Sequence, residues 1–403
     1  MRILLHTMYF LPDFGSAPIL MNELAASLTA AGHEVEVVTT LPRVRSAGLP
    51  ARLYSRSRGD GFTVKRFWTN ATPHPLGRLL AWNIYTAGAL ANLVSVGRGD
   101  LLFLRTPPLQ LGVPAFWGRA LRGTRTLVNV QDIHPDLAIE SGILRNPAGI
   151  RFARGLERWV YGLADRIVVI SEGFKKNLLV KGVPEPKLEV IPNWVDTDFL
   201  KPLPKDNALA RKLGLHDKFV IMYSGTISIS SNLALERVLE AAKALAPERK
   251  VLFVIVGEGL KKGSLRAKAS SLGLDNAVFL PFQPYPDLPA LLASSDVLLV
   301  PLDEQKSQLS VPSKLYNFMA AGRPILGLAT EGSEVASVLR TTGGGMSVPP
   351  GDLAGFERAV LDLKRSPDAR RAAGEKAREF VVQTFAKDLI LARFDRTLRD
   401  MAR

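Results

Sequence analysis

The sequence IPNWVDTDFLKPLPK, residues 191–205, separates two series of alternating strand and helix patterns. Its three prolines favour a stiff, extended connection and disfavour a helix or a central strand. On each side, short runs of apolar or β-branched residues alternate with longer segments of helical period. The runs before this connection are residues 3–5, 35–39, 101–104, 126–130, 167–170 and 188–191, and those after it are 219–223, 251–256, 278–280, 297–300, 325–328 and 346–348.

Runs that are apolar on both faces are typical of strands in a parallel sheet that helices cover. The two series therefore predict an α/β protein with two doubly wound, Rossmann-like domains facing a cleft. We expect an N-terminal domain over residues 1–195 and a C-terminal domain over residues 196–380. Only helical patterns follow Pro367, and we expect residues 381–403 to form a C-terminal helix that crosses back to the first domain.

Length and composition narrow the possible functions. A chain of 403 residues is longer than one hydrophobic core usually serves, and 47% hydrophobic with 22% charged residues is an ordinary globular composition. The absence of cysteine excludes disulfides, thiolate metal sites and cysteine nucleophiles. Five scattered histidines do not suggest a zinc site, so we expect no metal.

The formal net charge of +14 is concentrated in one segment. Residues 41–125 hold thirteen Arg or Lys and two Asp, a net charge of +11, among the aromatic residues Tyr54, Phe62, Phe67, Trp68, Trp82, Tyr85 and Trp117. This mixture suits an anionic membrane surface or a nucleic acid, or it is a solubilising face with separately buried aromatics. Because no helix-turn-helix, RNP or zinc-finger pattern is present, we favour the membrane surface and expect no nucleic-acid partner.

Two segments bear on location. Residues 79–96 are mostly apolar, but Asn83, Thr86, Asn92 and Ser95 interrupt them, which favours a helix packed in or on a domain over a membrane span. The N-terminus enters a strand-like run with no small-residue cleavage site after it, so no signal peptide is expected. These features predict a cytoplasmic protein, peripheral on the inner face of the cytoplasmic membrane.

Polar residues follow several strands of the first series. Gly15 and Ser16 precede a helical pattern, where backbone N–H groups could receive a phosphate, although a simple strand-to-helix turn explains this loop better when it is judged alone. After the run 126–130, Asp132, His134 and Glu140 lie in a cluster that could handle protons or hydrogen-bond a substrate. Asp132 is nearest the strand, while His134, which precedes a proline, could only shape the turn.

The second series has two comparable loops. The sequence GEGLKKG, residues 257–263, resembles a glycine-rich phosphate loop in part, but it lacks the ending of a P-loop and does not indicate nucleotide hydrolysis. Pro312 and Ser313 predict the start of a short helix that ends at Gly322. Lys314 and Asn317 share one face of it and could hold a diphosphate and ribose hydroxyls, or they are a solvated lysine and a capping amide.

Taken in order, these motifs resemble retaining glycosyltransferase family 4, in its bacterial branch of exopolysaccharide, O-antigen and capsule assembly. The resemblance covers about residues 1–390. It rests on Gly15 and on TPPL at 106–109, VQDIHPD at 130–136, ISE at 170–172, IPNWVDTD at 191–198, YSGT at 223–226, VGEG at 256–259 and PSKLYNFMAAGRP at 312–324.

This resemblance implies a GT-B architecture in which the second domain holds a nucleotide sugar and the first holds the acceptor, with no metal at the diphosphate. It implies that Gly15 and Ser16 face the β-phosphate and that Phe282 lies beside the base. Further donor-binding candidates are Gly225, Thr226, Gly257, Ser313, Lys314, Leu315 and Asn317. Asp132, with His134 and Glu140, would act at the donor sugar or the acceptor hydroxyl.

The chain departs from the family pattern in places. The two glutamates that many members carry near Lys314 correspond here to Leu309 and Asn317, and residues 227–232 lack the usual Arg and Lys. Lys314, or Lys261 or Lys262, would then neutralise the diphosphate.

The expected activity is retaining transfer of a hexose or N-acetylhexosamine-type sugar from a nucleoside diphosphate, preferably UDP, to a polyprenyl-diphosphate-linked saccharide. The alternatives are a GT-B sugar-nucleotide epimerase, which needs no acceptor, and a non-catalytic basic membrane or nucleic-acid binder on a transferase fold.

Overall fold

The protein, described here from a computed structural model, consists of two compact units. Unit 1 comprises Met1–Asn193 and Asp388–Arg403, and unit 2 comprises Trp194–Lys387. The structure describes residues 1–13, 15–42, 53–70, 74–97, 100–227, 229–302 and 312–403. Leu309 lies outside the described residues, as do Arg43, Arg45, Arg52 and Arg98 of the basic segment.

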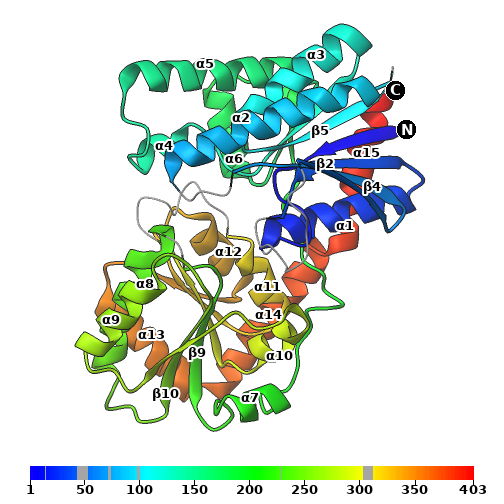
Figure 1. The fold of residues 1–403 in the computed structure, drawn as a ribbon. Coiled ribbons are helices and arrows are strands. Elements are labelled where there is room, and N and C mark those ends of the chain that lie inside the picture. The colour runs from blue at the N-terminus through cyan, green and yellow to red at the C-terminus, as the bar shows by residue number, and fades with distance from the viewer. Residues whose placement is uncertain (14, 43–52, 71–73, 98–99, 228, 303–311) are drawn as a thin grey trace. The chain divides into compact units, whose positions relative to one another are not determined.

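Unit 1 is built on an eight-stranded sheet of order β3-β4-β2-β1-β5-β6-β7-β8 (Figure 1). All its pairings are parallel except that of the edge strand β3 with β4. The strands are β1 Arg2–His6, β2 Glu34–Thr40, β3 Tyr54–Gly59, β4 Phe62–Phe67, β5 Leu101–Thr106, β6 Arg125–Val130, β7 Arg166–Val169 and β8 Leu188–Val190.

Helices cover both faces of this sheet, which buries the apolar strands on either side. Figure 1 shows α2, α3 and α5 along one face and α1 with the C-terminal α15 along the other. The helices are α1 Ser16–Ala30, α2 Pro75–Ala91, α3 Gly112–Arg122, α4 Asp136–Glu140, α5 Pro147–Leu163, α6 Glu172–Val180 and α15 Lys387–Ala402, with 3-10 turns at Asn92–Ser95, Leu109–Leu111 and Glu185–Lys187.

Unit 2 has a six-stranded, all-parallel sheet of order β11-β10-β9-β12-β13-β14. Its strands are β9 Phe219–Ser224, β10 Val251–Val256, β11 Ala277–Leu280, β12 Val297–Pro301, β13 Ile325–Leu328 and β14 Gly345–Val348. Its helices are α7 Ala208–Lys212, α8 Ile229–Ala244, α9 Lys262–Ser271, α10 Leu288–Ala293, α11 Lys314–Ala320, α12 Glu334–Thr342, α13 Leu353–Arg365 and α14 Pro367–Thr384, with a 3-10 turn at Tyr285–Asp287.

The predicted fold is confirmed in its two doubly wound parallel sheets and in the return of the C-terminal helix. All twelve predicted runs lie on strands. The hairpin of β3 and β4 was not predicted. Helix α15 belongs to unit 1, where Phe394 packs against Phe103 of β5, with ring centroids 5.9 Å apart. Within the described residues, no helix has both the length and the apolar character needed to cross a bilayer.

The apolar segment at 79–96 is a helix packed on the sheet. It forms most of α2 and the 3-10 turn that follows. Tyr85 on this helix is fully buried, and its hydroxyl donates a hydrogen bond to the Val38 carbonyl of β2 at 2.8 Å. Tyr85 and the buried Phe62 are therefore core residues, although both belong to the aromatic set of the basic segment.

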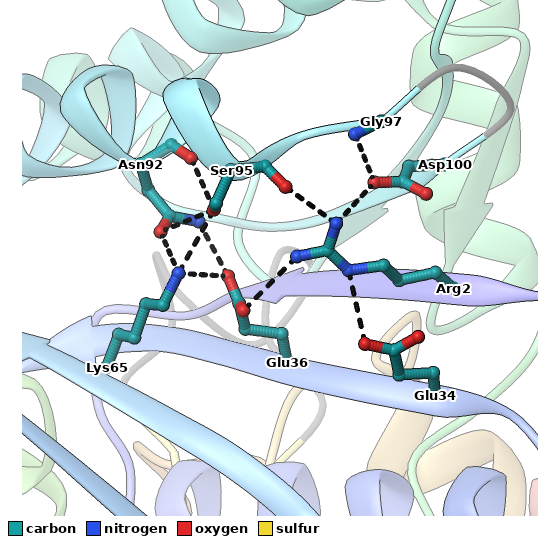
Figure 2. A network of polar contacts seen from close by, with 8 residues as sticks. All are labelled: Arg2, Glu34, Glu36, Lys65, Asn92, Ser95, Gly97 and Asp100. Atoms are coloured by element: carbon teal, nitrogen blue, oxygen red, sulfur yellow. Dashed lines mark hydrogen bonds and ion pairs between the residues drawn. The ribbon is translucent and has the colours of Figure 1, made fainter.

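Part of the basic segment is also internal. Lys65 on β4 is buried, and its ammonium lies 2.9 Å from a Glu36 carboxylate oxygen and donates a 2.8 Å hydrogen bond to Asn92 (Figure 2). Arg2 on β1 joins the same network through Glu36 and, at 3.1 Å, Asp100. Burial alone would raise the pKa of Glu36, but hydrogen bonds from Asn92 and Lys65 outweigh it and lower that pKa.

Candidate active site

In unit 2, the predicted donor residues gather beyond the carboxyl ends of neighbouring strands. Gly225 and Thr226 follow β9, Gly257 follows β10, and Phe282 follows β11. Because β11, β10 and β9 are adjacent in the sheet, these loops lie side by side, where doubly wound sheets bind their ligands.

Glycine lets two of these loops touch through their backbones. The Gly225 N–H donates to the Val256 carbonyl at 3.0 Å, and the Ile227 N–H donates to the Glu258 carbonyl at 2.9 Å. A Cβ on Gly257 would lie 2.0 Å from the Gly225 carbonyl oxygen, which no side chain could tolerate. The loop after β9 and the loop after β10 therefore form one rigid backbone surface.

Lys314, the first residue of α11, reaches over this surface. Its ammonium donates a 2.9 Å hydrogen bond to the Tyr223 hydroxyl and lies 4.0 Å from the centre of the Tyr223 ring. The Tyr223 hydroxyl in turn donates to the Thr226 carbonyl at 2.7 Å. A Cβ on Gly225 would lie 2.7 Å from the ammonium, so the charge lies directly beside the glycine turn.

No described carboxylate forms an ion pair with Lys314. Its positive charge is therefore held in place by a buried tyrosine and left uncompensated by the described residues. A fixed, uncompensated cation beside exposed backbone is suited to an anionic group such as a diphosphate.

The other predicted donor residues differ in what they expose. The Phe282 side chain is 46% exposed, so its ring is open to a ligand. Ser313 and Asn317 are half-buried at the start and on the face of α11. Leu315 is fully buried, and its N–H donates to the Pro312 carbonyl at 2.9 Å. The Leu315 side chain therefore anchors the helix, and the binding role predicted for this residue stays a prediction.

In unit 1, Asp132 follows β6 and interacts electrostatically with Arg105 of the adjacent β5. Burial raises the pKa of Asp132, and the charge of Arg105 opposes this rise. Burial lowers the pKa of Arg105 to about 10, which Asp132 and Tyr9 oppose. The Arg105 Nε is buried without a hydrogen-bond partner among the described residues. These two strand ends thus carry two partly desolvated groups of opposite charge that interact electrostatically.

His6 ends β1, the neighbouring strand, and is also unusual. It is fully buried, and neither ring nitrogen has a hydrogen-bond partner among the described residues. Burial lowers its pKa to about 4, so it is neutral at pH 7. Gly15 and Ser16 are exposed at the N-terminal end of α1, where Gly15 has a φ of 121° that favours glycine.

The structure does not group the three predicted acid–base residues in one environment. The His134 ring packs edge-on against Trp82 of α2, with centroids 5.7 Å apart, and burial lowers its pKa to about 4. Glu140 instead lines a cavity of about 830 Å³ between α4, α5 and α6, together with Asp136 and Arg151. Asp132 alone lies beside Arg105.

Comparison with known proteins agrees with this arrangement. The model of the glycosyl transferase 4-like domain matches residues 17–194, and that of glycosyl transferases group 1 matches residues 218–366. The chain belongs to the glycosyltransferases of family 4. This transferase is 29% identical to the colanic acid biosynthesis glycosyl transferase WcaI of Escherichia coli over 99% of this chain and 100% of that one.

Solved structures share the fold of this family 4 transferase. Sucrose-phosphate synthase from Thermosynechococcus elongatus matches with a TM-score of 0.77 and 18% identity, covering 99% of this chain and 98% of that one. Anabaena HepE in complex with UDP-glucose matches with a TM-score of 0.72 and 18% identity, covering 99% and 100%. Both likenesses support the two-domain GT-B fold.

Sequence reasoning missed Tyr223 and Arg105 of the transferase. Tyr223 lies inside a buried strand and looks like a core residue, and only the structure shows its hydroxyl beside the Lys314 ammonium. Arg105 left a visible signal, because it is a single cation at the end of the apolar run LLFL, directly before the TPPL motif. A charge there costs free energy unless it has a purpose at the strand end.

Proposed function

We propose that this glycosyltransferase moves a hexose or N-acetylhexosamine-type sugar, with retention of configuration, from UDP to a polyprenyl-diphosphate-linked saccharide in bacterial surface-polysaccharide synthesis. The name of WcaI supports the polysaccharide assignment, and the UDP-glucose bound to HepE supports the donor class. We place the acceptor at an anionic, cytoplasmic membrane surface.

The placement of Lys314 carries this proposal. A departing UDP gains negative charge on its diphosphate, and a cation already fixed beside it stabilises that charge without reorganising. Lys314 is so fixed by the Tyr223 hydroxyl and ring, beside the Gly225 turn. Residues 227–232 offer no cation of their own, so Lys314 takes the neutralising role without a metal.

The remaining donor contacts follow from exposure and chemistry. The open Phe282 ring can stack on the base, and the Asn317 amide on the Lys314 face can hydrogen-bond ribose hydroxyls. The backbone at Gly225 admits the diphosphate closely because this residue has no side chain, and the buried Gly257 holds the two loops together beneath it.

In unit 1, Asp132 is the group that we assign to the sugar or the acceptor hydroxyl. The neighbouring Arg105 charge favours its ionised form, in which both oxygens accept hydrogen bonds. Gly15 and Ser16 lie at the N-terminal end of α1, a helix of fifteen residues, and their backbone N–H groups can donate hydrogen bonds to the β-phosphate. His134 is neutral and packed against Trp82, so we assign it a supporting role.

The proposal is tested with purified protein, a panel of nucleotide sugars and a polyprenyl-diphosphate saccharide. We expect UDP to be released only when the acceptor is present. We also expect NMR to show the same anomeric configuration in the new glycosidic bond as in the donor sugar. Lys314→Ala should lower kcat/KM about 100-fold. Donor conversion without acceptor would indicate the epimerase instead, and no nucleotide binding across the panel would refute the transferase.

A further inference from the structure

Helices α3 and α5 of unit 1 carry large apolar side chains on their outer sides. Phe116, Trp117 and Leu121 are exposed on α3, and Phe152 and Trp159 are exposed on α5. Phe152 is 74% exposed and Leu121 is 64% exposed, so neither side chain is covered by the rest of unit 1. We call these five residues, with the exposed arginines of both helices, the α3–α5 face.

Three of the apolar residues of the α3–α5 face, Phe116, Trp117 and Trp159, lie close together across the two helices. The Phe116 ring lies 5.4 Å from Trp117 on its own helix and 6.1 Å from Trp159 on α5, measured between centroids. The two helices approach closely at Gly112, where a Cβ would lie 2.6 Å from Val160. An exposed apolar surface that spans two helices indicates an interaction site.

Arginines dominate the charges on the two helices, although Arg151, Arg154 and Arg158 also line the cavity that contains Asp136 and Glu140. The exposed arginines of the face are Arg119, Arg122, Arg151, Arg154 and Arg158. Neither helix has an exposed acid: Glu157, the one carboxylate on α3 or α5, is buried and lies 2.6 Å from the Lys181 ammonium of the neighbouring segment. Asp165, which follows α5, forms an ion pair with Arg119 at 3.1 Å. Within the described residues, the other four arginines form no ion pair.

We infer that the α3–α5 face binds the surface of an anionic lipid bilayer. Tryptophan and phenylalanine insert at the level of the headgroups, and surrounding arginines bind lipid phosphates while their stems lie along the apolar boundary. The inference rests on the proposed function, because a lipid-linked acceptor requires such a contact.

This inference places the membrane contact partly outside residues 41–125, the segment for which it was predicted. Within that segment Lys65, Phe62 and Tyr85 are buried, and only its α3 residues contribute to the face. Helix α5, which supplies three of the five arginines, lies outside the segment altogether.

The test measures co-sedimentation of the full chain with vesicles that contain phosphatidylglycerol. Arg151→Gln with Arg158→Gln should weaken binding about ten- to thirty-fold at low salt. The matched control, Arg56→Gln with Arg58→Gln on the exposed β3, removes the same charge from the same unit and should change binding less than two-fold. Equal loss in both pairs would overturn the inference, since it would indicate a diffuse charge effect.

A second variant tests the apolar component. Phe152→Ser should also weaken vesicle binding, and it should leave UDP affinity by calorimetry unchanged, which verifies folding. Unchanged vesicle binding in this variant would refute insertion of the face. A wild-type dimer in light scattering that Phe152→Ser dissociates would assign the face to a second copy and overturn the membrane proposal. If the wild-type protein does not bind UDP in calorimetry, the proposed function is refuted, whereas the vesicle experiment still tests the membrane contact.

Discussion

At the scale of single residues, Tyr223 determines where the Lys314 charge lies. It is fully buried near the end of β9, and its hydroxyl is held by the hydrogen bond that it donates to the Thr226 carbonyl. A flexible lysine on its own would lose conformational entropy on binding a diphosphate. Holding the ammonium in advance removes part of that cost.

We therefore predict that Tyr223→Phe lowers UDP affinity about tenfold, because it removes the hydroxyl and keeps the ring. Isothermal titration calorimetry with UDP measures the change. The double variant Tyr223→Phe with Lys314→Ala should bind UDP no more weakly than Lys314→Ala alone, since the hydroxyl acts through the lysine. Additive losses would show that Tyr223 acts independently.

His6 gives a second prediction at this scale. Its folded pKa of about 4 lies below the ordinary value of 6.5, so the unfolded chain binds the proton more readily. Stability therefore falls as the pH decreases from about 6.5 to 4, by about 3 kcal/mol for this group. His6→Leu should reduce that loss in urea unfolding, whereas replacing the exposed His216 by Gln should not.

At the scale of elements, the close contact of two loops in unit 2 depends on one glycine. Gly257→Ala would place a methyl group against the Gly225 carbonyl oxygen and separate the loops after β9 and β10. We expect a loss of stability of about 2 kcal/mol and a loss of UDP binding. Gly263→Ala in α9, where a Cβ meets no atom within 4 Å, is the control and should retain both.

The network in Figure 2 connects β1, β2 and β4 to the 3-10 turn before β5. Lys65→Met would leave the buried Glu36 carboxylate without its ammonium partner. We predict a destabilisation of about 2 kcal/mol by urea unfolding, because the buried carboxylate would keep only the more distant Arg2 guanidinium, at 3.4 Å, and the Asn92 amide as partners. The double variant Lys65→Met with Glu36→Gln should recover part of the lost stability. A Lys65→Met variant as stable as the wild type would contradict the stabilising role of Lys65.

Prediction from sequence succeeded for elements with a strong pattern. The parallel strands are apolar on both faces, so their runs identify them without structural information. β3 is polar and exposed, with the sequence YSRSRG, and gave no such run. Its signal was the turn instead: Asp60 and Gly61 join β3 to β4 as a two-residue hairpin loop, and both have positive φ.

The candidate site was only partly predictable, for a physical reason. Loop positions follow from topology, so Lys314 and Asp132 could be placed at strand ends. Tyr223 could not, because it lies inside a strand, where sequence does not show which way a side chain points or what it meets. Arg105 stood out as a single charge after an apolar run, but sequence did not show that Asp132 would be its neighbour. Likewise, spacing suggested one cluster of Asp132, His134 and Glu140, whereas the turn and α4 place them in different surroundings.

At the scale of the whole molecule, the chain leaves unit 1 after Asn193 and returns at Asp388. The two passages pair with each other at the border: the Val195 N–H donates to the Phe385 carbonyl at 3.0 Å, and the Lys387 N–H donates to the Val195 carbonyl at 2.9 Å. Unit 1 consequently depends on both ends of the sequence, whereas unit 2 is one continuous segment.

This paired passage makes unit 2 an inserted domain, with its own two ends adjacent. A gene fragment encoding residues 194–387 should therefore yield a folded protein that binds UDP, and Lys314→Ala in that fragment should weaken the binding. Failure of the fragment to unfold cooperatively in urea would contradict this expectation. A domain whose two ends lie together can be exchanged as a unit. Replacing residues 194–387 by the corresponding segment of a relative should therefore change donor preference and leave the fold of unit 1 intact.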